Sequence, residues 1–261
     1  MPEYLSIDKF HTGFIVLILV IIVAVAGQII VKKLMGRDNL VLCHEVAGYY
    51  LSIVGALYAV TLGLVVFDSM SKFQATSETV EQEASAIVSV YTLADQLPAG
   101  DRTTIKALAE QYVDEVIDNE WSLMERGDKS MKARYIVFSL LEKVKAVEPV
   151  TENQKGIFPV ILEQSLSIWN NRRLRTNQSD NGIASIEWVI LISGAVITVI
   201  FTYFFTISIH KVQLFMTGMV TAVIAMNLYL VLLFGEPFSG DLKISHDPFL
   251  VAQKFIDEHH D

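Results

Sequence analysis

Between Glu45 and Asp68 the chain reads VAGYYLSIVGALYAVTLGLVVF, residues 46–67, with no charged side chain in 22 positions. An α-helix rises about 1.5 Å per residue, so about 20 residues cross a hydrocarbon core roughly 30 Å thick. The stretch is therefore long and apolar enough to span a membrane.

Three further stretches have the same character. They hold 20, 22 and 24 residues and lie between His11 and Lys32, between Glu187 and His210, and between Lys211 and Glu236. A buried helix of a soluble protein explains one such run, but not four in one chain. The sequence predicts an all-α membrane protein with four transmembrane helices in two hairpins. A helical-bundle extramembrane domain is inserted between spans two and three.

The charges also set the predicted boundaries. These are an N-terminal tail, 1–11; hairpin one, 12–67, with spans 12–31 and 46–67; an extramembrane domain, 68–187; hairpin two, 188–235, with spans 188–209 and 212–235; and a C-terminal tail, 236–261. Residues 32–45 form the loop of the first hairpin, and only His210-Lys211 closes the second. An even number of spans places both termini and the large domain on one side of the membrane.

The composition narrows the classes of function. Hydrophobic residues make up 52% of the 261 residues, charged residues 19%, and the net charge is −9. Nucleic-acid binding needs a basic surface, so a nucleic-acid partner is not expected. The chain has no GxSxG, HExxH, phosphate-binding loop or glycine-rich dinucleotide turn, so we expect no enzyme, no cofactor and no metal site.

The extramembrane domain reads as helical throughout. Span two continues without a breaker to Leu97 and stops at Pro98, after which Asp101 is the expected N-cap of the next helix. That helix is expected to stop at Gly127. Thr151 and Gln154 have the spacing of a capping box, and Pro159 is expected to kink the helix that follows or to mark its start.

Span two carries small residues on one helical face. They are Gly48, Ser52, Gly55, Ala59 and Gly63. Small side chains let another helix approach closely, within or between subunits. They also leave room for a lumen when identical helices surround a symmetry axis. The pattern fits helix packing and pore lining alike.

Charged groups cluster at the two ends of the domain. Asp68, Glu78, Glu81 and Glu83 follow span two, and in a symmetric oligomer they form rings that attract cations, or else a solvated helix face. Arg172, Arg173 and Arg175 precede span three, where they contact anionic lipid head groups or pair with acids of the domain. No charged residue lies within a span, which disfavours an energised transporter.

The order of these features resembles the bacterial bestrophin-like domain family of four-span membrane proteins. The resemblance rests on span two running into Glu83-Ala84, on Tyr112 followed by Glu120-Trp121, on Arg172-Arg173 ahead of span three, and on Pro237-Phe238-Ser239-Gly240 after span four. It covers nearly the whole chain.

The resemblance implies kinship with bestrophins, which are oligomeric ion channels. It implies a homo-oligomer, a pentamer by analogy, in the bacterial plasma (inner) membrane, in contact with lipid and inorganic ions. Span two would line the pore and the helical domain would form a vestibule. The alternative is a non-conducting scaffold or sensor whose helical domain binds a partner. Bestrophins keep the large domain in the cytoplasm, whereas Lys32, Lys33 and Arg37 place it outside by the positive-inside rule.

Overall fold

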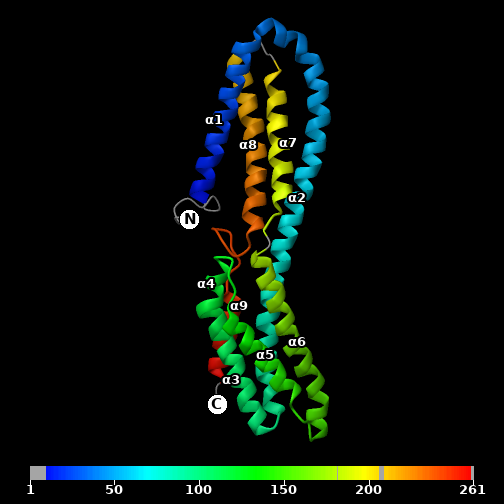
Figure 1. Cartoon of the computed structure of the whole chain (residues 1–261), viewed down its shortest axis with the longest axis vertical. Helices are drawn as coiled ribbons and strands as arrows, with labels where there is room; N and C mark the ends of the chain where they lie inside the picture. The colour runs from blue at the N-terminus through cyan, green and yellow to red at the C-terminus, as the bar shows by residue number, and fades with distance from the viewer. Residues whose placement is uncertain (1–9, 181, 206–208, 260–261) are drawn as a thin grey trace. The chain divides into compact units, whose positions relative to one another are not determined.

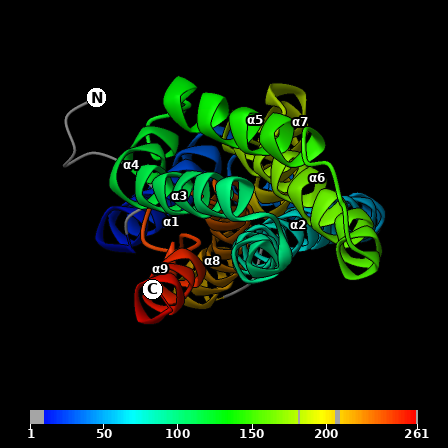
Figure 2. The same ribbon diagram turned by 90° about the horizontal axis from the view of Figure 1, so that it is seen from below.

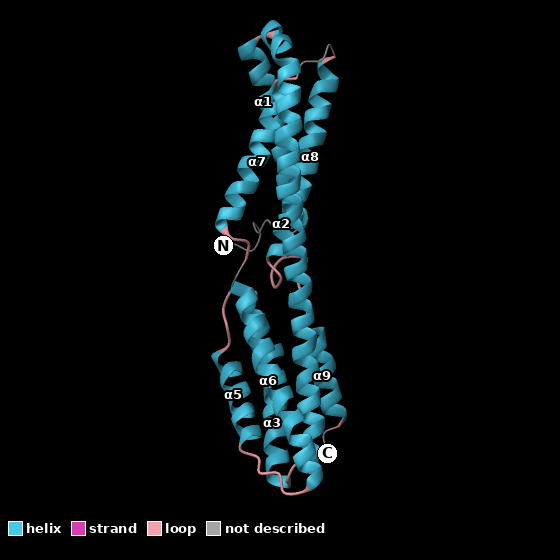
Figure 3. Cartoon of the chain, turned by 90° about the vertical axis from the view of Figure 1, so that its right-hand side faces the viewer, coloured by secondary structure: helices cyan, strands magenta, loops and turns pink. Residues whose placement is uncertain are grey.

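A computed structural model describes the backbone of residues 10–180, 182–205 and 209–259, and their side chains except at 37–45 and 180. The part of the chain that it describes is helical and contains no strand (Figure 3). The α-helices, labelled in Figure 1, are α1 (Phe10–Met35), α2 (Arg37–Leu93), α3 (Ala99–Glu115), α4 (Trp121–Met124), α5 (Met131–Lys145), α6 (Glu152–Asp180), α7 (Ser185–Tyr203), α8 (His210–Gly235) and α9 (Asp247–Glu258).

Four helical stretches are long and apolar enough to cross a membrane. They are Phe10–Met35, Val46–Gln96, Ser185–Tyr203 and His210–Gly235. They contain the predicted spans 12–31, 46–67 and 212–235, and the predicted fold class is confirmed. The predicted span 188–209 was too long, because α7 ends at Tyr203, and the predicted closing pair His210-Lys211 is instead the start of α8. Of the predicted N-terminal tail, residues 1–9 lie outside the described residues, and α1 begins at Phe10.

The chain divides into two compact units, and the first holds the membrane helices. It comprises residues 1–72, 183–236 and 240–242. Here α1 and α8 are antiparallel neighbours: Gly13 faces the Tyr229 ring near one end, and Lys32 Nζ lies 2.9 Å from Nδ1 of His210 near the other. A core of Tyr58, Leu62, Leu191, Ala195 and Val231 joins α2, α7 and α8.

The predicted loop 32–45 is largely helical instead. Helix α1 continues to Met35 and α2 begins at Arg37, so Gly36 alone separates them. At its other end α2 stops at Leu93, and a 3₁₀ turn, Ala94–Gln96, leads to the predicted break at Pro98.

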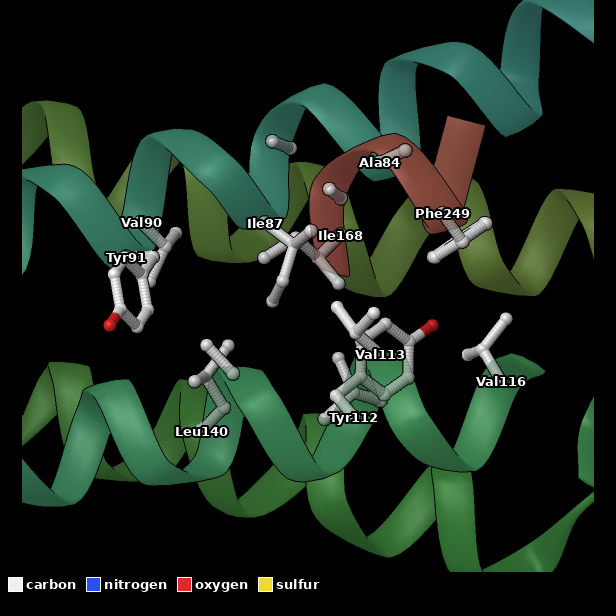
Figure 4. Packing of buried hydrophobic residues seen from close by; sticks show 14 of the residues in the cluster. Ala84, Ile87, Val90, Tyr91, Tyr112, Val113, Val116, Leu140, Ile168 and Phe249 are labelled. Atoms are coloured by element: carbon white, nitrogen blue, oxygen red, sulfur yellow. The ribbon is translucent and has the colours of Figure 1, made fainter. Parts of the chain in front are cut away.

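The second unit is a helical bundle with its own apolar core. It comprises residues 73–182, 237–239 and 243–261. Figure 2 shows α5 and α9 on either side of α3, and both contact it. Ile87, Tyr91, Tyr112 and Leu140 are among the buried residues that meet between α2, α3 and α5 (Figure 4).

Local chemistry explains two of the helix ends in this unit. Thr151 and Gln154 form the predicted capping box, in which the Gln154 amide donates to Thr151 Oγ1 and Gln154 Oε1 accepts from the Thr151 amide, both at 3.2 Å. Gly127 has φ 76° and follows α4, as predicted, and its freedom from a Cβ permits this left-handed stop.

The predicted N-cap at Asp101 was wrong, and so was one of the two alternatives predicted for Pro159. Asp101 is not an N-cap, because α3 already begins at Ala99 after the cap residue Pro98; its carboxylate pairs instead with Lys143 at 2.8 Å. Pro159 does not start a helix, since α6 runs from Glu152 through it to Asp180, and the kink at Pro159 stays a prediction.

Most of the segment predicted as a C-terminal tail belongs to the helical bundle. Helix α9 has an apolar face, with Phe249, Ala252 and Ile256 all buried in the bundle core. Gln253 on the same helix donates to Asp114 of α3 at 2.7 Å.

Candidate functional site: an open helix face and a buried charge cluster

The small-residue face of α2 is largely uncovered by its own chain. Ser52, Ala59 and Gly63 are exposed, and a Cβ added to Gly55 or Gly63 would meet nothing within 4 Å. Gly48 is the exception, because the Phe205 ring would lie 3.8 Å from its Cβ. Packing within one chain therefore does not explain glycine at positions 55 and 63.

Other glycines in the same unit have a packing reason. A Cβ on Gly13, Gly194 or Gly235 would overlap the side chain of Tyr229, Tyr58 or Ile183, respectively. Packing within the single chain thus requires glycine at positions 13, 194 and 235, but not at positions 55 and 63.

The open face borders a groove of about 520 Å³ between α2 and α8. Gly55, Ala59 and Gly63 line one side, and Met219, Val223 and Asn227 line the other. The walls of the groove are mostly apolar. The nearby hydroxyls of Ser52 and Thr61 on α2 each donate a hydrogen bond to the backbone carbonyl four residues earlier in the same helix. The groove can accept a neighbouring helix or contribute to a lumen between subunits.

The four acids that follow this face do not stay together. Asp68 pairs with Lys72 at 2.6 Å, and at roughly 100° per residue it lies roughly 140° around the helix from Gly63. Glu83 is fully buried in the second unit. Glu78 and Glu81 remain exposed to solvent. Of the four acids, these two form no ion pair with a basic side chain among the described residues.

Glu83 belongs to a buried charge cluster built around Arg175. Nε and Nη2 of Arg175 donate to the two carboxylate oxygens of Glu83 at 2.7 and 2.9 Å, and Nη2 also donates to Glu120 at 2.8 Å. All three side chains are fully buried. Bidentate arginine–carboxylate pairs combine fixed geometry with strong hydrogen bonds, which suits a site from which water is excluded.

Arg172 and Tyr112 complete the cluster. Arg172 Nη2 donates to Glu120 and to the carbonyl of Ser130, and the Tyr112 hydroxyl donates to Glu83. Two arginines and two glutamates thus cancel in formal charge. The cluster connects α2, α3 and α6 through side chains far apart in the sequence.

A π-helical turn, Val116–Glu120, delivers Glu120 to this cluster. The turn lies between α3 and α4, and the Trp121 amide donates to the Val116 carbonyl across it. In a regular α-helix Glu115 and Glu120 would lie roughly 140° apart. The wider turn lets both carboxylates, and Trp121, reach the buried side.

Aromatic rings enclose the arginine. The Arg175 guanidinium lies 5.4 Å from the centre of the Trp121 ring and 5.5 Å from that of Phe249. Phe238 meets Trp121 edge to face, with ring centres 5.6 Å apart. A turn in which the Ile244 amide donates to the Pro237 carbonyl at 2.8 Å holds Phe238, and Gly240 adopts φ 76° within it.

The cluster shifts the pKa of its members in ways that keep it intact. Burial, together with the neighbouring Glu83 carboxylate, raises the pKa of the Tyr112 phenol well above its usual value. Burial alone would lower the pKa of Arg175, but Glu83 and Glu120 raise it well above the usual range. Tyr112 therefore stays a hydrogen-bond donor and Arg175 stays charged at any physiological pH.

Glu115 anchors a second, smaller network beside the first. Its carboxylate accepts from Ser130 and pairs with Lys132, both at 2.7 Å, and accepts from Asn119 at 3.1 Å. Burial opposes ionisation, but the hydrogen bonds from Lys132, Ser130 and Asn119 outweigh it and lower the pKa of Glu115 from its usual 4.5.

The sequence patterns identified part of this site. Glu120, Trp121, Arg172 and Phe238 meet in the cluster, whereas Arg173 is exposed. Of the two readings of the arginines, the structure shows acid pairing for Arg172 and Arg175. The roles of Glu83, Tyr112 and Glu115 in these networks were not predicted, although Glu83 and Tyr112 are among the residues that carry the family resemblance.

Solved structures share this architecture. A variant of a bacterial bestrophin homolog from Klebsiella pneumoniae is 13% identical, with a TM-score of 0.71 over 94% of this chain and 99% of that one. Another crystal structure of the Klebsiella homolog is also 13% identical, with a TM-score of 0.66 over 92% and 97% of the two chains. The fold is therefore that of this bacterial bestrophin homolog.

The sequence points to the same group. A family model described as the bestrophin-like domain matches residues 18–249. The chain belongs to the bestrophin-like domain family, and it is a membrane protein. No curated protein matches the chain in sequence.

Proposed function

We propose that the protein is a homo-oligomeric ion channel in which the small-residue face of α2 lines the pore and the helical bundle forms a vestibule. The observation that carries the proposal is the empty space beside Gly55 and Gly63. Glycine at these positions leaves room that the single chain does not use, and a lumen between identical helices uses it. Membership of the bestrophin-like family supports the same reading.

Exposed apolar side chains on the helical bundle support self-association. Met131, Tyr135 and Phe138 recur on one face of α5, and their exposed fractions are 54%, 65% and 48%. On α6, Leu166 and Leu174 are also exposed. A water-facing surface with such side chains in a row is typical of a protein–protein interface, and in our proposal neighbouring copies cover it.

In this proposal, carboxylates along α2 favour cations. Glu78 and Glu81 are exposed and lie beyond the small-residue face on the same helix. Repeated around a symmetry axis, each forms a ring of negative charge that concentrates cations and repels anions. Asp68 and Glu83 contribute less in this arrangement, because Lys72 and Arg175 neutralise them.

Purified protein in planar lipid bilayers tests the proposal. We expect discrete currents, and we expect Gly63→Leu to reduce them because leucine fills the space beside α2. Leu57→Ala is the matched control, since Leu57 is exposed on the same helix but does not line the α2 groove. Folded protein that never conducts would contradict the channel and favour the alternative, a non-conducting scaffold or sensor whose helical domain binds a partner.

A further inference from the structure

A second cavity in the membrane unit combines apolar walls with a polar floor. It encloses about 400 Å³ and adjoins the α2 groove at Val220. Leu51, Phe205 and Met216 supply apolar walls, and Thr202, Gln213 and Thr217 supply polar groups. These residues come from α2, from α7 and the residues just after it, and from α8, and Gln213 is only 3% exposed.

The polar floor contains a buried hydrogen-bond acceptor that no described group satisfies. Gln213 Nε2 already donates to the Phe205 carbonyl, the Thr202 hydroxyl donates to the Val199 carbonyl at 2.6 Å, and the Thr217 hydroxyl donates to Thr202 Oγ1 at 3.4 Å. Gln213 Oε1 is buried and has no partner among the described residues. A buried acceptor without a donor is costly, above all within a membrane, so the floor selects a ligand that brings a donor.

Basic groups lie one helical turn from this floor. His210 precedes Gln213 by three residues on α8, hence on the same face, and Lys32 Nζ lies 2.9 Å from its ring. Lys33 and Lys211 are exposed near the same end of the unit. This charge disfavours an ammonium ligand and favours one that carries an anion beside its donor.

The polar layer extends to α1. Gly13 faces Tyr229, Gly218 faces Val25 and Lys32 faces His210, so the register places Gln28 within about one turn of Gln213 and Thr217. Gln28 is 1% exposed, and neither its Oε1 nor its Nε2 has a partner among the described residues. Two buried carboxamides at one level indicate a layer built to hold a polar group.

We propose that this cavity binds an anionic phospholipid whose head group carries a hydroxyl. One acyl chain packs against Leu51 and Met216, a head-group hydroxyl donates to Gln213 Oε1, and the phosphate lies toward Lys32 and His210. The apolar walls suit an alkyl chain, and the acceptor floor and nearby cations suit the two ends of such a head group. The site is independent of whether α2 lines a pore.

Lipid retention by the purified full chain tests this site. The protein is washed in detergent, supplied with phosphatidylglycerol, phosphatidylethanolamine or phosphatidylcholine, and the bound lipid is counted by native mass spectrometry. We expect phosphatidylglycerol to be retained, phosphatidylethanolamine less, and phosphatidylcholine, which has no donor, least. Gln213→Leu should reduce phosphatidylglycerol retention at least about fivefold, the effect of one lost buried hydrogen bond.

Controls separate the site from general effects on folding. Thr221→Val alters a buried α8 threonine that does not line the cavity, and it should leave retention unchanged. Leu51→Trp narrows the cavity without touching its polar floor, and it should also release the lipid. Equal retention of the three lipids, or full retention by folded Gln213→Leu, would overturn the proposal. The proposal would also be overturned if the intact oligomer of the unsubstituted chain retained no lipid because a second copy of the chain filled the cavity.

Discussion

Arg175 binds two buried carboxylates, Glu83 and Glu120, that come from distant parts of the chain. The spacing of Arg172 and Arg175 places them on one helical face, so a shared role is predictable. Their acidic partners are not, because Glu83 lies 92 residues and Glu120 55 residues from Arg175. Glu120 also depends on a π-helical turn, which shifts the helical register in a way that no spacing rule anticipates.

Replacing Arg175 should destabilise the protein severely. Arg175→Met leaves Glu83 and Glu120 buried without their main cation, which typically costs about 3–5 kcal/mol. Thermal unfolding of the detergent-solubilised protein measures the loss. Arg173→Met is the matched control, since Arg173 is exposed, and it should change stability by about 0.5 kcal/mol or less. Similar melting temperatures for the two variants would show that the cluster contributes little.

The Glu115 network should make the protein acid-sensitive. Folding lowers the pKa of the Glu115 carboxyl group. The ionised carboxylate therefore stabilises the fold fully above pH 4.5, its usual pKa, and this stabilisation is lost as the pH falls through the lower pKa of the folded state. Unfolding measured from pH 7 down to pH 3 should show this loss. Glu115→Gln should flatten the acid side of the curve, whereas Glu163→Gln, at an exposed position, should not. Parallel curves for all three proteins would refute the assignment.

At the scale of elements, the hydrophobic runs correctly predicted the membrane helices, but the polar residues between the first two runs led to the wrong prediction of a loop at 32–45. Residues 37–45, RDNLVLCHE, contain neither glycine nor proline, so charge alone suggested a loop there. Charged side chains do not stop a helix, and α2 begins at Arg37. The small-residue face was also visible in the sequence. That Gly55 and Gly63 face open space while Gly194 does not could be learned only from the packing.

Glycines on different helices should therefore respond differently to a methyl group. Gly194→Ala forces a Cβ into the Tyr58 ring between α7 and α2 and should cost about 1–3 kcal/mol. Gly63→Ala meets open space and should not destabilise the folded chain. Thermal unfolding of both variants in detergent gives the comparison. A larger loss for Gly63→Ala would mean that neighbouring subunits pack tightly against α2 rather than around a lumen.

At the scale of the whole molecule, the apolar stripe on α5 and the open face of α2 both call for neighbouring copies. Each is exposed in one chain, yet one lies on the helical bundle and the other among the membrane helices. A single sequence shows such faces but not the symmetry that joins them, so the assembly itself is a proposal.

Placing a charge in the α5 stripe should weaken the oligomer. Tyr135 is 65% exposed, and Tyr135→Glu would place a carboxylate in an apolar interface without a partner. Light scattering coupled to gel filtration should then report a smaller particle. Gln111→Glu adds the same charge at an exposed position of α3, outside the stripe, and should leave the mass unchanged. An unchanged mass for both variants would place the subunit contacts elsewhere.

Thiol modification of α2 tests the central claim most directly. In a Cys43→Ser background, Ala59→Cys places the only thiol on the small-residue face, and Val60→Cys places it on the next position, which is 63% exposed but does not line the α2 groove. A small cationic methanethiosulfonate reagent is added while currents are recorded in a planar bilayer. If α2 lines the pore, the Ala59→Cys channel loses current irreversibly and the Val60→Cys channel does not. Conducting channels in which both thiols are inert, or in which only the thiol at position 60 reacts, would contradict the account.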